Sequence, residues 1–114
     1  MELTFHLVPK NYFDSLDPRR DYMPRDFARE GFIHCTDGAE EMARTANRYY
    51  RANAESHYYL YIDKARVRPP IRYDDPGKIY PHIYGALNRD AIVAVRDVRR
   101  GSDGTFLAPE PLAT

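Results

Sequence analysis

The sequence predicts a single α+β domain with a mixed, mostly antiparallel sheet, one main helix and a few short helices. Three observations lead to this prediction. The chain has 114 residues, which suits one domain with one hydrophobic core. Apolar residues make up 43% of it, enough to offset the entropy lost when a chain becomes ordered. Segments with a two-residue hydrophobic period alternate with short segments of helical period, so strands and helices share the domain.

The strands are predicted from the alternation of side chains. Residues 3–8 alternate between the two sides of a strand until Pro9 breaks the run. Residues 57–63 alternate in the same way and are rich in tyrosine, which favours strands. Residues 67–78 contain three prolines, so we expect loop or sheet edge there. Further strands are expected at residues 32–35, 79–87 and 92–98.

The main helix is predicted at about residues 38–52. Asp37 and Glu40 form a capping-box pattern at its start, and apolar residues then recur at helical spacing. We expect the helix to pack on the sheet through Met42, Ala46, Tyr49 and Tyr50. Short helices are expected at residues 11–17, before Pro18, and at residues 24–30, before Gly31.

The domain is predicted to span residues 1–100. Residues 101–114 contain Pro109 and Pro111 and are expected to form a mobile C-terminal tail, with at most a short edge strand. No run of about 18 apolar residues is present, and the first residues lack a basic segment followed by an apolar one. We therefore expect a cytoplasmic protein without membrane contact, and the oligomeric state stays open.

The charge balance argues against a dedicated duplex-DNA binder. Seventeen basic side chains match seventeen acidic ones, whereas binding to a phosphate backbone favours a basic excess. Arg44, Arg48 and Arg51 recur on the polar face of the main helix. Such a face is usually solvated, and weak RNA binding through these arginines is the other interpretation.

The histidines mark the best candidate site. Three of the four lie on predicted strands, where neighbouring side chains point to opposite faces. If Phe5, Ile33 and Ile83 face the core, the histidines beside them share the other face. The predicted polar and aromatic face contains Thr4, His6, His34, Thr36, Tyr80, His82 and Tyr84, and we take His6, His34, Thr36, His82 and Tyr84 as candidate ligand-binding residues. His57 is expected to be exposed and uninformative.

Other chemistry finds less support in the sequence. Each histidine alone is also consistent with simple packing at a sheet edge. Three histidines suit zinc, but no HxH or HExxH spacing is present, so no metal is expected. Cys35 is the only cysteine, which excludes an intramolecular disulfide, and it points away from its neighbour His34 on a strand.

Several segments resemble a known family. GFIHCTD at residues 31–37, YLYID at 59–63 and YPHIYGALNRDAIVAV at 80–95, together with His6, resemble a small bacterial family called domain of unknown function 952. The resemblance runs from about residue 3 to residue 98. The family name carries no activity, so the resemblance informs fold more than function.

The chain is also distantly similar to the ADP-ribosyltransferase superfamily, and within it to RNA 2′-phosphotransferases. The matching positions are His6, Gly31 and His34 with Thr36. This resemblance implies an ADP-ribosyltransferase-like fold, a split sheet that binds NAD, and a transferase activity. The chain departs from the pattern because Leu7-Val8 replaces the usual Gly-Thr and because residues 79–98 contain no glutamate.

The sequence leaves three functions open. The first is an enzyme, or a domain derived from one, that binds NAD or a related nucleotide in a histidine-lined pocket. The alternative is a non-catalytic module that binds a small molecule or regulates through it, since fold alone does not establish chemistry. Weak RNA binding is the third option, and no residue is assigned a catalytic role.

Overall fold

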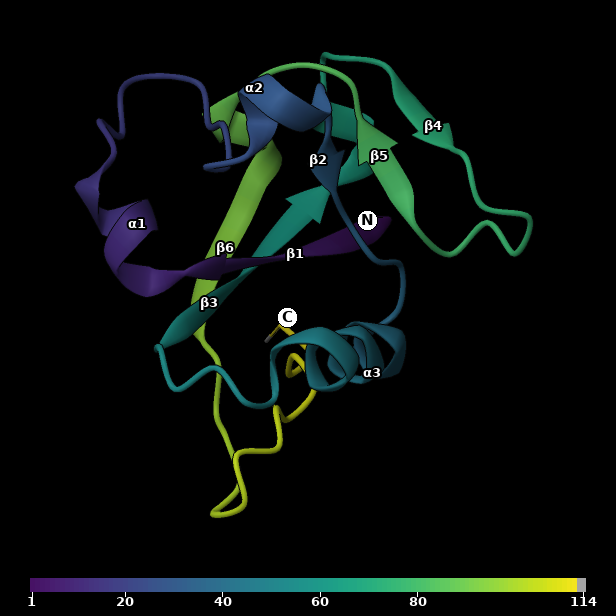
Figure 1. Cartoon of the computed structure of the whole chain (residues 1–114). Helices are drawn as coiled ribbons and strands as arrows, with labels where there is room; N and C mark the ends of the chain where they lie inside the picture. The colour runs from purple at the N-terminus through teal and green to yellow at the C-terminus, as the bar shows by residue number, and fades with distance from the viewer. Residues whose placement is uncertain (113–114) are drawn as a thin grey trace.

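The computed structural model describes residues 1–112, and its strands form two three-stranded sheets (Figure 1). The large sheet has the order β1 (Leu3–Pro9), β3 (His57–Asp63), β6 (Ile92–Asp97), and the small sheet has the order β2 (Ile33–His34), β5 (Pro81–Ile83), β4 (Ile71–Tyr73). Every pairing between these strands is antiparallel. The predicted α+β class is confirmed, while the single sheet expected from the sequence is divided in two.

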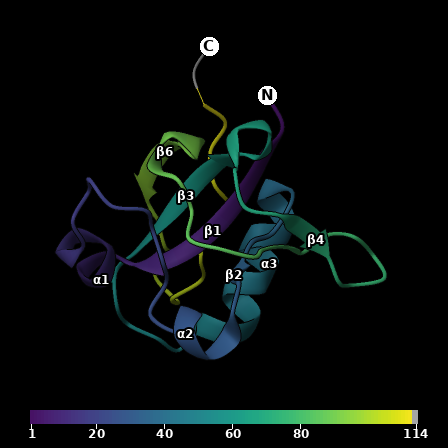
Figure 2. The same cartoon turned by 90° about the horizontal axis from the view of Figure 1, so that it is seen from above.

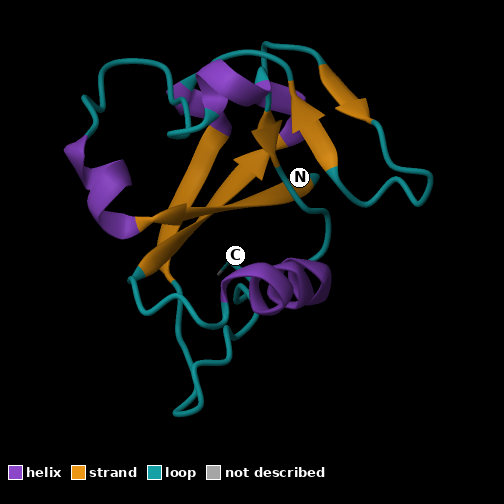
Figure 3. Cartoon of the chain, in the orientation of Figure 1, coloured by secondary structure: helices purple, strands orange, loops and turns teal. Residues whose placement is uncertain are grey.

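Within residues 1–112, three α-helices connect or flank the sheets, as Figure 3 illustrates. They are α1 (Lys10–Ser15), α2 (Phe27–Glu30) and α3 (Ala39–Tyr50), and short 3₁₀ turns lie at η1 (Lys64–Arg66) and η2 (Arg89–Ala91). The helix α2 ends at Gly31, which takes the left-handed conformation that glycine favours. Within residues 1–112, no helix has the length and apolar character needed to cross a membrane.

The central strand of the large sheet is buried on both faces. Figure 2 shows the strands of this sheet side by side, with β3 in the centre. Tyr59 and Tyr61 of β3 face the cluster that includes α3, whereas Leu60 and Ile62 face the cluster that includes the small sheet. The sequence predicts a half-buried strand here. Because β3 is central and covered on both sides, its polar-looking tyrosine face is buried as well.

The helix α3 packs on the large sheet through only part of the predicted stripe. Met42 and Ala46 are buried, as expected. Tyr49 and Tyr50 are 67% and 44% exposed, because a cleft opens beside the last turn of the helix and they lie at its rim. The predicted cap also differs. Gly38 occupies the N-cap position, and the Asp37 carboxylate accepts hydrogen bonds from Tyr73 and Lys64 instead.

The C-terminal segment packs against the domain instead of standing apart as the predicted tail. Phe106 is 1% exposed, and the Asn47 side chain of α3 exchanges two hydrogen bonds with its backbone, at 2.7 and 3.0 Å. The hydroxyls of Tyr59 and Tyr61 donate to carbonyl groups of Leu107 and Glu110. These contacts extend the packed region beyond residue 100, and residues 113–114 of the predicted tail lie outside the described residues.

Candidate functional site

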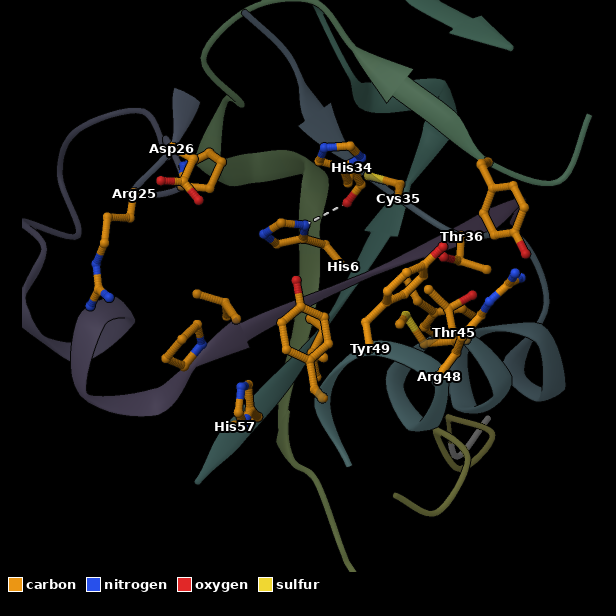
Figure 4. A pocket seen from close by; sticks show the side chains of 18 of the residues that line it. His6, Arg25, Asp26, His34, Cys35, Thr36, Thr45, Arg48, Tyr49 and His57 are labelled. Carbon is orange, nitrogen blue, oxygen red and sulfur yellow. Dashed lines mark hydrogen bonds between the residues drawn. The ribbon is translucent and has the colours of Figure 1, made fainter. Parts of the chain in front are cut away.

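A cleft of about 820 Å³ runs along β1, between α3 on one side and the segment that leads into β2 on the other. Its size lies within the range of roughly 300–1,000 Å³ that small-molecule sites occupy. Figure 4 shows the side chains that line it, with His6 between the two walls. Four of the five predicted site residues line this cleft, namely His6, His34, Thr36 and His82.

The cleft exists because β1 is an edge strand that is only partly covered. Phe5 exchanges backbone hydrogen bonds of 2.9 and 2.8 Å with Thr36, which closes the edge at that point. Antiparallel pairing alternates the direction of backbone groups, so the N–H and C=O of Leu7 also face away from β3. Leu7 lines the cleft, and its backbone groups therefore lie at the open edge of the sheet.

His6 is buried and held at both ring nitrogens. Nδ1 lies 2.6 Å from the carbonyl oxygen of His34, and Nε2 lies 2.7 Å from the hydroxyl of Tyr22. A carbonyl oxygen can only accept, so Nδ1 carries the hydrogen and Nε2 accepts from Tyr22. Burial lowers the pKa of His6 to about 4, which keeps the ring neutral near pH 7.

The contacts of His6 join three segments of the chain. The ring links β1 to the backbone of β2 and to Tyr22, and Tyr22 exchanges two backbone hydrogen bonds with Leu87. These bonds attach the loop around residue 22 to the domain at two points. Because neither ring nitrogen of His6 is free, this side chain orders the wall of the cleft and has no position left for a proton from a ligand.

His34, His82 and Tyr84 lie on the outer face of the small sheet. His34 pairs with His82 across β2 and β5, and their ring centroids are 5.2 Å apart. Each histidine meets a carboxylate, with His34 Nε2 3.0 Å from Glu30 and His82 Nδ1 2.9 Å from Asp74. Tyr84 also donates to Asp74, but it does not line the cleft.

The predicted face is not one continuous surface, because His6 lies on a different sheet from His34 and His82. The alternation within each strand is as predicted, since Ile33 and Ile83 are buried while His34 is exposed. His6, however, belongs to the large sheet and points into the space between the sheets, where Val8 of its own face is also buried. The histidines come together around a cleft and not on one continuous sheet face.

His57 is the clearest correction to the sequence prediction. It is 3% exposed, packs against the Phe106 ring at 5.5 Å, and its Nδ1 donates to the Glu55 carbonyl. Burial lowers the pKa of His57 below its usual value. The residue lines the cleft as well. The sequence carries no local signal for this burial, because the covering Phe106 comes from the C-terminal segment.

The charged side chains that line the cleft include five carboxylates and also two arginines that the sequence left unassigned or assigned only to a surface patch. Arg25 lies over the Tyr12 ring at 5.1 Å, and Arg48 lies over the Tyr49 ring at 5.6 Å. Both line the cleft, and neither forms an ion pair with a carboxylate within residues 1–112. Figure 4 shows them on opposite sides of His6.

The patch predicted for RNA is largely neutralised. Arg44 forms an ion pair with Glu41, and Arg51 forms one of 2.9 Å with Asp103. Arg48 is the only member of the predicted trio without a carboxylate partner among the described residues. Of these three arginines, the one without a carboxylate partner among the described residues lines the cleft.

The described residues offer neither an activated thiol nor a cluster of metal ligands. Cys35 is buried in the apolar core, and burial raises the pKa of its thiol, so the reactive thiolate is disfavoured. In the described part of the chain, no three His, Cys, Asp or Glu side chains are grouped as ligands for a metal ion. The predicted histidines thus all line the cleft, but they are not arranged around a common metal position.

These features define a small α+β domain with two antiparallel sheets and a cleft beside an edge strand. The family model described as "Protein of unknown function (DUF952)" matches residues 7–95, and the chain belongs to this family. The fold is similar to that of protein CC0527 from Caulobacter crescentus and of a double mutant of that protein. Each comparison has a TM-score of 0.76 and 19% identity over 91% of this chain and 92% of the other. No curated protein matches the chain.

Proposed function

We propose that the cleft beside β1 binds a nucleotide-like small molecule, with NAD as the first ligand to test. The observation that carries this proposal is the pair of cleft-lining arginines, Arg25 and Arg48, that have no carboxylate partner within residues 1–112. A guanidinium group matches phosphate oxygens in charge and in geometry. Two such groups on opposite sides of one cleft can each bind an anionic group of a ligand that extends between them, whereas the lining carboxylates of Asp26 and Glu41 are already paired with Arg29 and Arg44.

The rest of the lining suits a ligand with a ring and polar edges. The rings of Tyr12, Tyr49 and Tyr80 line the cleft and offer flat surfaces on which a base can stack. The backbone N–H and C=O of Leu7, at the open edge of β1, can pair with a donor and an acceptor of the ligand. Apolar walls with a few placed polar groups are typical of small-molecule sites.

NAD fits these features through its two phosphates, its two ring systems and its carboxamide. The distant resemblance of His6, Gly31 and His34 to ADP-ribosyltransferases points to the same ligand. Transfer of ADP-ribose would require a group that stabilises the departing nicotinamide. Both ring nitrogens of His6 are engaged, and β6 contains no glutamate. Binding is therefore the function that the cleft supports best.

Isothermal titration calorimetry with NAD, ADP-ribose and AMP tests the proposal. Arg25→Gln and Arg48→Gln should each weaken binding by about tenfold, because each removes one charge-assisted hydrogen bond. Arg96→Gln is the matched control, since Arg96 is exposed on β6, lies outside the cleft and bonds only to the neighbouring Val95 carbonyl. Its affinity should equal that of the parent protein.

Chromatography of the same mixtures separates a binding module from a transferase. Saturable binding of NAD without release of nicotinamide supports the binding function, whereas release of nicotinamide supports an ADP-ribosyltransferase-like enzyme. The proposal is wrong if none of the three ligands binds, or if both arginine variants bind as tightly as the parent.

A further inference from the structure

His34 and His82 form a pair at one end of the cleft. They occupy paired positions on β2 and β5, their ring centroids lie 5.2 Å apart, and both line the cleft. Their surroundings hold them in place. The Phe32 ring stacks on His82 at 4.1 Å with an angle of 17°, and the backbone carbonyl of His34 accepts from His6 at 2.6 Å. Phe32 also meets the His34 ring edge-on at 4.8 Å, so one phenyl ring contacts both imidazoles.

Each of the two rings has one nitrogen engaged and one nitrogen free. Asp74 lies 2.9 Å from His82 Nδ1, so a hydrogen is held there and Nε2 remains as an acceptor when the ring is neutral. Glu30 lies 3.0 Å from His34 Nε2, which leaves Nδ1 free. No hydrogen bond within residues 1–112 uses either free nitrogen. His6 differs, because both of its nitrogens are occupied.

We propose that His34 and His82 act together as a general acid and a general base that hydrolyse a phosphodiester bond of a nucleotide bound in the cleft. This inference rests on the proposed nucleotide-binding function. Two adjacent imidazoles with a carboxylate behind each are suited to moving two protons in one displacement. The positively charged Arg25 and Arg48 along the same cleft would hold the anionic substrate.

The reaction consumes one water molecule. Neutral His82 takes a proton from the water through Nε2, and the water oxygen forms a bond to phosphorus. The bond between phosphorus and the ester oxygen of the leaving group breaks, and protonated His34 donates the proton of Nδ1 to that oxygen. The products are a phosphomonoester and an alcohol, and the two histidines regain their starting states by proton exchange with solvent.

The roles follow from exposure and contacts. The His82 side chain is 18% exposed and is fixed by Phe32 and Asp74, which suits a base that must be aimed at one water molecule. The His34 side chain is 57% exposed, so solvent can return its proton after each turnover. Asp74 and Glu30 are positioning residues. Asp74 also accepts a hydrogen bond from the Tyr84 hydroxyl, and the Arg72 guanidinium lies over the Tyr84 ring, 5.3 Å from its centroid.

Hydrolysis of 2′,3′-cyclic AMP to 2′-AMP or 3′-AMP, followed by chromatography, tests the pair. The parent protein should show a bell-shaped dependence of kcat on pH, because one histidine must be neutral and the other protonated. His82→Ala should lower kcat by about a hundredfold or more and remove the acidic limb. His34→Ala should lower kcat to a similar degree and remove the alkaline limb.

The carboxylates are tested with matched controls. Asp74→Asn and Glu30→Gln should lower kcat by about tenfold with KM nearly unchanged, because they misorient the rings without removing them. Asp21→Asn and Glu40→Gln, at exposed positions outside the cleft, should leave both constants unchanged. Circular dichroism melts of all variants distinguish a lost reaction from a lost fold.

The outcomes separate this inference from the function on which it rests. If the parent protein binds AMP or 2′,3′-cyclic AMP but does not hydrolyse the cyclic ester, the acid–base pair is refuted and the binding function stands. If folded His34→Ala and His82→Ala proteins hydrolyse the ester as fast as the parent, the pair is refuted too. If no nucleotide binds, both proposals fail.

Discussion

Acidification should destabilise the protein through His6. Its folded pKa is about 4, because burial disfavours the charged ring, whereas the ordinary pKa of a histidine is 6.5. As pH falls through this interval, the unfolded chain takes up a proton before the folded one does, so the free energy of unfolding decreases. The contribution is fully present above about pH 6.5 and is lost by about pH 4. The difference between the two values corresponds to roughly 3 kcal/mol.

Urea unfolding at several pH values measures this effect. The parent protein is compared with His6→Asn, in which the amide can still donate to the His34 carbonyl but does not titrate. His57 has a lowered pKa as well, and together with the carboxylates it contributes to the pH dependence of both proteins. The difference between the two unfolding free energies therefore isolates His6, and it should shrink by roughly 3 kcal/mol from pH 7 to pH 4.

Nuclear magnetic resonance supplies an independent readout. The imidazole signals of His6 should remain those of a neutral ring until about pH 4, provided that the protein stays folded. The reasoning is refuted if His6→Asn and the parent lose stability in parallel over the whole range. It is refuted equally if the His6 signals titrate near the ordinary value of 6.5 in the folded protein.

Three substitutions test the packing around the cleft. Tyr22→Phe removes the hydroxyl that donates to buried His6, so we expect a loss of about 1–3 kcal/mol in urea unfolding, against a smaller loss for Tyr58→Phe, whose partner Asp14 is exposed. Phe106→Ala should cost about 3–5 kcal/mol because the ring is 1% exposed, and an effect no larger than that of Leu107→Ala would show that the C-terminal segment is not docked. Gly85→Ala should lower the melting temperature and destabilise the fold by about 1–3 kcal/mol, because φ at this residue is +156° and the added Cβ would lie 2.9 Å from Pro69. Gly77→Ala is the control and should be close to neutral, because the added Cβ would have its nearest contacts at 3.6 Å.

Much of the local structure could be predicted because it depends on residues that are close in sequence. Alternation along residues 3–8 and 57–63 predicted β1 and β3, and helical spacing predicted α3 within two residues at each end. The two-residue period of a strand also predicted that His34 and His82 point to the opposite sheet face from Ile33 and Ile83. The resemblance to the family was likewise read from short motifs along the chain, and the family model matches residues 7–95.

The prediction of the site was less complete, because a cleft depends on contacts between distant segments. The sequence singled out His6, His34, Thr36 and His82, and the structure brings these four around one cleft. It did not single out Arg25, and it assigned Arg48 to a surface patch. Whether an arginine has an acidic partner depends on what lies opposite in space, which a local pattern does not report.

The sequence by itself determined the approximate positions of most strands and helices and which side chains share a face within each element, although the strand expected at residues 79–87 forms only at Pro81–Ile83. Only the tertiary structure decided how those elements assemble. It divided the strands into two sheets, buried His57 beneath Phe106, and left the edge of β1 open beside α3. The physical reason is that hydrophobic period sets local geometry, whereas burial and ion pairing are set by groups far apart in the chain that meet only on folding.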